Sequence, residues 1–348
     1  MVQSTTSIEV HVEIRDTLDQ HREVWDHLVD LQPVPSHCLK SWWLEATVEG
    51  NPVYVLVFEG NDLLGGVPLE RDTWRGLSRF RTMGERLWPC HFDLVADPRR
   101  GTAVTTAIAA WIRRQSPALF HLKGLEPGSR LAAAFPSPTI LKEEEPSYST
   151  ELRGSLDAYL AEKSGSFRRD LKRNRKRVSD AGYTPLLTPL EEATEALECL
   201  REIHRRQFGS QSALLPVFDA FERAAQAGIE RGEVEILQIR DAAGVPRAIE
   251  VWTTAGDRVE AFAHGQHPDA VDGAGNALLA FGIETFSARG KTSLDLGSHH
   301  GEWKRRWAPI ETRCLTLTSA VGGRARQLHV ARNLANASRR WMRRLRRR

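Results

Sequence analysis

The segment "AHGQHPDAVDGAGNALLAFGIE", residues 263–284, joins the end of an apolar strand to an alanine-rich helix through a loop that contains Gly273 and Gly275. The first turn of a helix exposes N–H groups and a partial positive charge, so a strand–loop–helix unit of this kind favours phosphate binding. Glycine lets a ligand approach the backbone closely, and Asn276 is of a type that caps helices. The same residues are also typical of an ordinary strand-to-helix turn with capping residues. A dinucleotide-binding fingerprint has a third glycine and lies in a parallel βαβ unit. This sequence shows neither feature, so it does not indicate a dinucleotide site.

The elements around this loop alternate between strand and helix patterns. Three strand-like runs with glycine-containing turns precede it, at 233–241, 245–256 and 258–268, and a strand at 292–297 follows its helix. A basic helix and two longer helices, at 189–208 and 215–232, come before the strands. A short helix at 301–307 and a strand at 313–321 come last. This order predicts helices layered on a mostly antiparallel sheet, an α+β fold.

The first half of the chain repeats the same order. A strand at 8–14 and helices at 17–31 and 36–50 precede a hairpin whose turn is Gly60-Asn61-Asp62. The hairpin "VLVFEGNDLLGGVPLE" matches "LQIRDAAGVPRAIE", and the unit that begins "DPRRGTAVTTAIAAW" matches "DGAGNALLAFGIETF" at an offset of roughly 175 residues. We therefore expect two similar halves, at 1–150 and 151–321, and an Arg-rich tail at 322–348. The Pro-rich stretch at 135–150 is expected to be a linker or a crossing strand.

Three stretches resemble the GNAT superfamily of acyltransferases, and in particular its CelD/BcsL-type members and the related Fem-type aminoacyltransferases. The loop 270–275 resembles the GNAT Gln/Arg-x-x-Gly-x-Gly/Ala loop, with Ala270 in place of Gln or Arg. "LDLGSHHGEWKRRWAP" (294–309) is similar to an Asp…Gly signature followed by aromatic-Lys-x-x-aromatic. "FRRDLKRNRKRVSDAG" (167–182) and "LREIHRRQFGSQSA" (200–213) resemble the group's basic helix and its Leu-x-x-x-His helix. The resemblance covers residues 10–320 and implies two tandem GNAT-like halves.

The resemblance also implies a co-substrate and site residues. Acetyl-CoA or another acyl-CoA would bind at Gly273, Ala274, Gly275 and Asn276. Asp295, Trp303 and Lys304 would line the acceptor pocket. The further candidates for substrate binding are Arg168, Arg169, His204 and His299. Because "DPRRGT" lacks the second glycine, one donor site is expected, in the second half.

Direct attack of an amine or hydroxyl on a thioester requires a base. Glu250 and Glu260 are acids inside strands of core character, where a buried carboxylate needs a partner. His264 flanks the loop, as do other histidines. We take Glu250, Glu260 and His264 as the catalytic candidates. A salt-bridged or edge-facing glutamate and a hydrogen-bonded histidine are the more common explanations of such residues. No Cys or His spacing indicates a metal site, so none is expected.

The segment Arg168–Arg177 holds seven Lys and Arg in ten positions. One narrow face of this helix is apolar, formed by Phe167, Leu171 and Val178, and the rest is basic. The pattern predicts a helix that packs through its apolar face. The basic face is then either merely solvated or binds an anionic substrate. The tail holds ten Arg and no acidic residue, so the net charge of +3 belongs to the tail and the rest of the chain is net acidic. Its stripe of apolar residues predicts an interfacial helix on an anionic membrane, or a solvated tail.

The apolar runs are too short to span a membrane, and the N-terminus lacks a signal-peptide core, so a cytoplasmic location is expected, with the tail at the inner face of the membrane. The function expected is transfer from acyl-CoA to an amine or hydroxyl of a cell-envelope sugar, lipid or polysaccharide precursor. The alternatives are a Fem-type transferase that takes its acyl group from aminoacyl-tRNA and a non-catalytic GNAT-like protein that docks on membranes. Other nucleic-acid roles are disfavoured because aromatic residues are not interleaved with the basic ones.

Overall fold

The computed structural model describes residues 10–298 and 301–328. Its first half forms, in chain order, β1 (Val10–Arg15), α1 (Arg22–Asp30), α2 (Ser41–Thr47), β2 (Asn51–Glu59), β3 (Asp62–Trp74), β4 (Leu77–Thr82), β5 (Val95–Ala96), α3 (Gly101–Arg114), β6 (Ala118–Leu125), α4 (Arg130–Ala133) and β7 (Thr139–Glu151). The second half forms α5 (Leu156–Ala161), α6 (Gly165–Asp180), β8 (Thr184–Leu187), α7 (Ala193–Gln207), α8 (Phe218–Glu230), β9 (Val234–Arg240), β10 (Pro246–Ala255), β11 (Arg258–Gln266), α9 (Ala274–Ala288), β12 (Ser293–Asp295), α10 (Glu302–Trp307) and β13 (Ile310–Val321).

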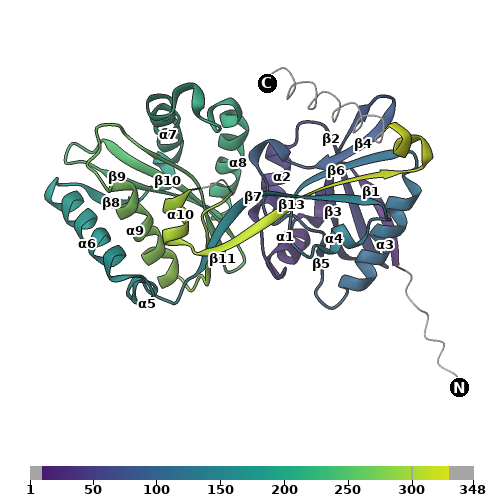
Figure 1. Cartoon of the computed structure of the whole chain (residues 1–348), viewed down its shortest axis with the longest axis horizontal. Coiled ribbons are helices and arrows are strands. Elements are labelled where there is room, and N and C mark those ends of the chain that lie inside the picture. Colours follow the sequence, from purple (N-terminus) through teal and green to yellow (C-terminus); the bar gives the residue numbers. More distant parts are fainter. Residues whose placement is uncertain (1–9, 299–300, 329–348) are drawn as a thin grey trace, which may run out of the picture.

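The described strands form one open, mostly antiparallel sheet that runs through both halves. Its order is β1-β2-β3-β4-β6-β13-β7-β12-β11-β10-β9-β8, with β5 paired to β3. The last strand, β13, lies between β6 and β7, so the end of the chain completes the sheet of the first half. β7 in turn pairs with β12 of the second half. The two lobes of the molecule are therefore joined by β7 and β13, which run side by side between them (Figure 1).

Three apolar clusters hold helices onto this sheet. In the first half, α1 and α3 pack on β2 and β3 around Trp25 and Ile108. In the second half, α5, α6 and α9 cover one face of the sheet, around Trp252. Helices α7 and α8 cover the other face together with α2 of the first half, whose Trp42 and Trp43 join that cluster. Helix α2 of the first half thus packs against the second half and is a second connection between the lobes.

Local sequence explains the two helices that frame the loop at 267–273. Helix α6 begins where Ser164 Oγ accepts a hydrogen bond from the Phe167 N–H, and it buries only the predicted face of Phe167, Leu171 and Val178. Helix α9 is apolar on most of its surface because it lies between the sheet and α6. A side-chain carbon on Gly282 would lie 2.3 Å from the Trp252 ring, so this position of α9 requires glycine.

The α+β fold of two similar halves is as the sequence predicts. The hairpin of β2 and β3, the helices α7 and α8 and the crossing strand β7 fall where they are expected. The predicted boundary at 150/151 falls at the end of β7. However, β13, which belongs to the predicted second half in sequence, pairs with β6 of the first half. The four cysteines are free thiols, and Cys38, Cys90 and Cys314 are buried. No helix in the described ranges is long and apolar enough to cross a membrane.

Candidate functional site

The sheet forks between β11 and β12. These strands pair in parallel over only three residues each, Arg258–Glu260 with Ser293–Asp295. β12 then ends, while β11 continues to Gln266 along its other neighbour, β10. The register between β10 and β11 shifts at this point, so that Phe262 has no opposite residue, as at a β-bulge. The bulge turns β11 away from β12, and the fork opens into a cavity.

The corresponding fork of the first half is filled by the chain itself. There β4 and β6 pair in parallel at Ser78–Arg81 and Ala118–His121. Beyond them Phe92 bridges Leu125, and its N–H donates to the Gly124 carbonyl at 2.7 Å. The two forks thus differ in the segment that follows the first of the two strands. After β4, Phe92 pairs with Leu125 at the first fork, whereas β11 leads through the loop 267–273 into α9.

A cavity of about 350 Å³, here called the fork pocket, lies at the open fork. Its apolar wall is largely aromatic and includes Trp88 from the first half, so both halves build it. Its polar groups come from β11, α7, α10 and the segment after β12. The residues that define it are Trp88, His204, Phe208, Gln211, Ser212, Ala213, Leu214, Glu260, Phe262, Ala263, His264, Leu296, Gly297, Ser298, Trp303 and Lys304.

A second cavity of about 330 Å³, the arginine pocket, lies between α6, the start of α9 and α10. Three guanidinium groups and two carboxamides line it, with aromatic rings at its base. Its residues are Phe167, Asp170, Leu171, Arg173, Asn174, Arg177, Asn276, Trp303, Arg306 and Trp307. The indole of Trp303, 40% exposed, borders both cavities, so the two pockets meet at this side chain.

The predicted donor loop lies beside the arginine pocket. Side chains of the protein itself already contact part of its backbone. Gly273 is the N-cap of α9 at φ +88°, and a side-chain carbon there would lie 2.4 Å from Asn174 of α6. The Gly275 N–H donates to Gln266 Oε1 at 3.0 Å. Asn276 does not cap the helix, because it lies inside its first turn, where its Oδ1 accepts from Trp307 Nε1 at 3.1 Å. Of the predicted loop residues Gly273, Ala274, Gly275 and Asn276, only Asn276 lines the pocket.

The three predicted bases occupy different environments. Glu260 and His264 line the fork pocket, whereas Glu250 lines neither cavity and accepts from Trp252 Nε1 at 2.9 Å. Burial raises the pKa of Glu250 to about 8, which keeps it largely protonated at neutral pH. Glu260 Oε2 lies 3.3 Å from Nδ1 of the buried His37, a residue of the first half. Geometry therefore narrows the candidate bases to Glu260 and His264.

His264 is an unprotonated base at neutral pH. Partial desolvation by the pocket walls and the nearby ammonium of Lys304 lower its pKa below the usual value, although the side chain remains exposed to solvent. Its ring lies edge-on to Trp303 at 5.4 Å between centroids. Its carbonyl accepts from Nε2 of the buried His204, whose Nδ1 lies 3.0 Å from Ser212 Oγ. The predicted substrate residue His204 therefore also holds the strand that carries His264.

Lys304 brings a cation to the same pocket. Its ammonium donates to the Ser298 carbonyl at 2.7 Å and lies 5.8 Å from the centre of the Trp303 ring. Burial lowers its pKa below the usual value, and the carboxylates of Asp295 and Glu260 oppose that shift. Trp303 and Lys304 thus both line the fork pocket. His299 lies outside the described residues.

Asp295 lines neither pocket, contrary to the expectation that it lines the acceptor site. Its carboxylate is fully buried, accepts from Ser147 Oγ at 2.8 Å and the Gly297 N–H at 2.6 Å, and pairs with Arg258. Although burial alone would raise its pKa, Arg258 and His91 lower it well below the usual range. Asp295 therefore positions the segment after β12 and has no accessible oxygen for a substrate.

The two arginines predicted to hold substrate point elsewhere. Arg168 donates to the carbonyls of Leu160 and Ala161 at the end of α5. Arg169 lies on the outer face of α6, by a shallow surface hollow. A helix turns by 3.6 residues, so it is Arg173 and Arg177, four residues apart, that reach the arginine pocket.

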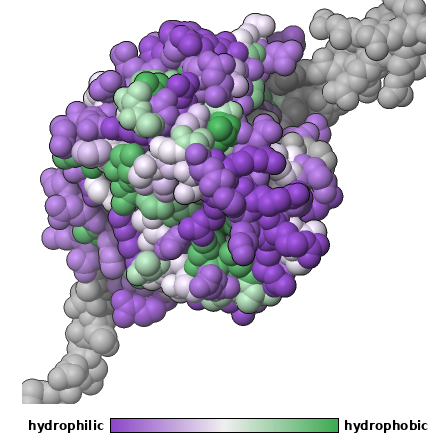
Figure 2. Space-filling model, turned by 90° about the vertical axis from the view of Figure 1, so that its left-hand side faces the viewer, coloured by the Kyte–Doolittle hydropathy of each residue, from purple (hydrophilic) through white to green (hydrophobic). Residues whose placement is uncertain are grey.

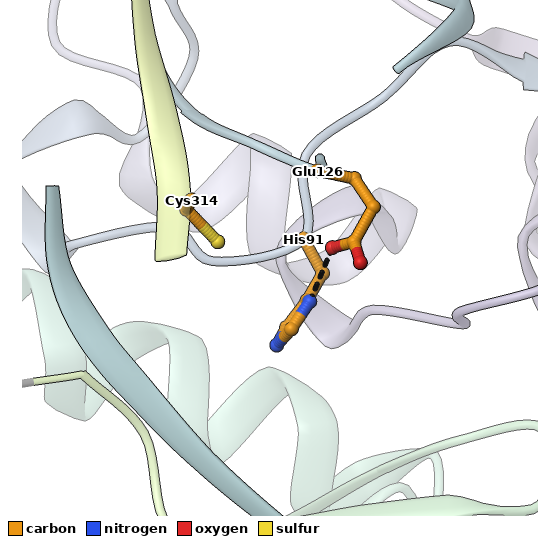
Figure 3. Close-up of side chains that lie close together, drawn as sticks. All are labelled: His91, Glu126 and Cys314. Atoms are coloured by element: carbon orange, nitrogen blue, oxygen red, sulfur yellow. Dashed lines mark hydrogen bonds and ion pairs between the residues drawn. The ribbon is translucent and has the colours of Figure 1, made fainter. Parts of the chain in front are cut away.

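Three potential metal ligands lie together near the fork. In the described ranges, ligand atoms of His91, Glu126 and Cys314 lie within 4.8 Å of one another (Figure 3). The ring of His91 is already bonded on both sides, by Glu126 at Nδ1 and by Asp295 at Nε2. Burial lowers the pKa of His91, but these carboxylates outweigh it and raise the value to about 10. We interpret the group as a buried ion-pair network between the halves.

Comparison with known proteins places this geometry in a class. Residues 165–305 match the family described as Acetyltransferase (GNAT) domain. No curated protein matches the sequence. FemX has a similar structure (TM-score 0.63, 11% identity, covering 89% of this chain and 96% of FemX). The C-terminal domain of a putative lysylphosphatidylglycerol synthetase from Agrobacterium fabrum is also similar (TM-score 0.56, 13% identity, 91% and 98% covered), as is L-PGS from Bacillus licheniformis (0.56, 13%, 86% and 91%).

At these identities the structural relatives show the fold alone. The match over residues 165–305 contains the fork, α6, α9 and most of α10. Residues 165–305 therefore match a GNAT acetyltransferase domain, and this match supports a transferase activity.

Proposed function

We propose that the protein transfers an acyl group from acyl-CoA to an amine or hydroxyl of a cell-envelope sugar, lipid or polysaccharide precursor. The observation that carries the proposal is the meeting of the fork pocket and the arginine pocket at Trp303. One pocket is rich in guanidinium groups and suits the phosphates of a donor. The other is aromatic with a few polar groups and suits a ring-bearing acceptor.

The chain's own groups supply the chemistry in this arrangement. The acceptor nitrogen or oxygen attacks the thioester carbonyl carbon while His264, neutral at pH 7, takes its proton. The ammonium of Lys304 stabilises the negative charge that forms on the carbonyl oxygen. The carbon–sulfur bond then breaks, the new amide or ester remains on the acceptor, and CoA leaves as the thiolate.

The acceptor class rests on the composition of the fork pocket and on the CelD/BcsL resemblance. Trp88, Phe262 and Trp303 offer flat apolar walls, and Glu260 and Lys304 offer one acceptor and one donor of hydrogen bonds. Such a pocket fits a sugar ring or a ring-bearing headgroup better than a flexible alkyl chain.

The test is thermal unfolding with and without acetyl-CoA, followed by thiol release with a panel of amino sugars and sugar alcohols. A ligand at a hundred times its Kd stabilises a protein by about 2.7 kcal/mol, which gives a clear rise in Tm. We expect a rise for the wild type and a smaller one for Gly275→Trp, whose side chain would displace Gln266. No rise with acetyl-CoA and no thiol release with any acceptor would overturn the proposal.

A Fem-type transferase that uses aminoacyl-tRNA is the second candidate. The structural likeness to FemX and the basic outer face of α6, with Arg169, Lys172 and Lys176, favour it. RNA binding that falls steeply with salt, together with no response to acetyl-CoA, would select this candidate.

A further inference from the structure

Asp170 lies between two arginines of the arginine pocket. Its Oδ1 accepts from Arg173 Nη2 at 2.5 Å, and its Oδ2 accepts from Arg306 Nη2 at 3.0 Å. One carboxylate thus bridges guanidinium groups from α6 and α10. Hydrogen bonds from Arg306 and Arg173 lower the pKa of Asp170, so it is ionised at neutral pH. Two cations are already spaced so that one small anion reaches both.

These ion pairs lie at the surface. The side chains of Asp170, Arg173 and Arg306 are 39%, 71% and 51% exposed. Exposed pairs of this kind contribute little to stability, so a stronger anion exchanges with the carboxylate at small cost. A phosphate has more acceptor oxygens and accepts bidentate bonds from arginine.

The backbone that would otherwise hold phosphate is obstructed. Asn174 of α6 lies against Gly273, and Gln266 already accepts from the Gly275 N–H. A ligand that enters the arginine pocket therefore meets guanidinium groups before it meets free N–H groups. Arg177 extends this set toward the loop, where its Nη1 lies 3.9 Å from Asp272.

We propose that Arg173 and Arg306 bind the phosphate groups of the acyl donor and that Asp170 is an internal competitor which the phosphate displaces. The inference rests on the proposed donor site and adds a binding role that the loop sequence does not indicate. Asp170 and Arg173 border both the arginine pocket and the surface hollow on the outer side of α6. Lys172 and Lys176 line only the hollow and contribute only general positive charge.

The end of the molecule that carries α6 and β8 is mostly hydrophilic (Figure 2), so many charges there attract anions without a specific site. The experiment must therefore separate local from general charge. Lys172→Gln is the matched control, because it removes one positive charge from the same helix on the outer face. Asp170→Asn removes the competitor at nearly constant shape.

Calorimetric binding of ADP and of acetyl-CoA is measured for the wild type and four variants at two salt concentrations. Asp170→Asn is expected to tighten both by about three- to tenfold, and Arg173→Gln and Arg306→Gln to weaken both by about tenfold or more. Lys172→Gln is expected to change either by less than twofold. Acetyl-pantetheine, which lacks the diphosphate, is expected to be turned over equally by the wild type and by Lys172→Gln.

Two results would overturn the inference. One is that ADP fails to bind the wild type or that Asp170→Asn does not tighten it. The other is that Lys172→Gln weakens binding as much as Arg173→Gln does. Transfer from acetyl-pantetheine in either case would leave the proposed function standing. ADP binding as expected without consumption of any thioester would support the anion site and contradict the function.

An RNA oligonucleotide that ends in adenosine is the last arm, because it offers the same phosphate chemistry as CoA. If the oligonucleotide displaces ADP and acetyl-CoA does not, the phosphate belongs to an RNA donor.

Discussion

His91 Nε2 lies 2.8 Å from a carboxylate oxygen of Asp295, although 204 residues separate them in the chain. The first belongs to the segment that fills the fork of the first half, and the second ends β12 at the open fork of the second. Ser147 of β7 and Arg258 of β11 bond to the same carboxylate. One buried anion thus ties three strands and both lobes, and it holds the segment that leads to Lys304.

Asp295→Asn is expected to lower the free energy of unfolding by about 3–5 kcal/mol, because removal of one partner leaves buried cations uncompensated. Urea denaturation at pH 7 measures this. The exposed Asp257→Asn, on the turn before β11, is the control and should cost less than about 1 kcal/mol. A similar loss in both variants would show that the cluster has no special role.

The same carboxylate makes the fold acid-sensitive. Its pKa is depressed in the folded state, so below the usual aspartate value of about 3.9 the unfolded chain binds more protons than the folded one. Its contribution to stability is present above that pH and is lost as the pH falls. In denaturation curves the stability difference between wild type and Asp295→Asn should therefore stay constant from pH 5 to about pH 4 and shrink progressively below that.

Glu250 has the opposite dependence. Burial raises its folded pKa to about 8, while its unfolded pKa is about 4.3, so between these values the folded state holds the extra proton. Stability then falls as the pH rises, by up to about 1.4 kcal/mol per pH unit. Glu250→Gln should remove this slope and be more stable than the wild type at pH 8. Parallel stability curves from pH 5 to pH 8 for wild type and Glu250→Gln would contradict it, with exposed Glu230→Gln as the control.

Periodicity and turn residues were sufficient for most of the fold. The hairpin at Gly60-Asn61, the amphipathic α7 and α8, and the glycine loop before α9 all depend on neighbours within a few residues. The exchange of β13 could not be predicted this way, because a strand's own pattern does not show which distant edge it joins. The same holds for α2, which belongs to the first half in sequence but packs on α8.

The site was predicted in part for the same reason. Trp303, Lys304, Glu260 and His264 lie near the fork in sequence as well as in space. Trp88 and His37 reach it from the first half, and no local signal marks them, although the abundance of tryptophan was a hint. The choice of Arg173 and Arg177 over Arg168 and Arg169 depends on the exact rotation of α6 against α9, which the buried triplet of Phe167, Leu171 and Val178 constrains only coarsely.

Lys304→Met is expected to lower kcat by about 10²–10³-fold and to leave the KM for the donor within about twofold. The substitution keeps most of the length of the side chain but removes the charge near the reacting carbonyl. Steady-state kinetics with acetyl-CoA measures it. Arg305→Met removes the charge of the next residue, which is exposed and pairs with Glu311, and should retain near wild-type kcat. Equal losses in the two variants would contradict a specific role.

His264→Asn is expected to lower kcat by about 10²–10⁴-fold, the usual contribution of a general base. Because the depressed pKa keeps His264 neutral well below pH 6.5, the kcat/KM of the wild type should stay level on the acid side of neutrality and fall only as the pH approaches the lower pKa. His267→Asn, in the loop after β11, is the control. Glu260→Gln should cost less, since that carboxylate is paired with His37. An acid limb near pH 6.5 would contradict the depressed pKa of His264. If Glu260→Gln is the more damaging change, the base is not His264, and Glu260 becomes the group to which the acceptor gives its proton.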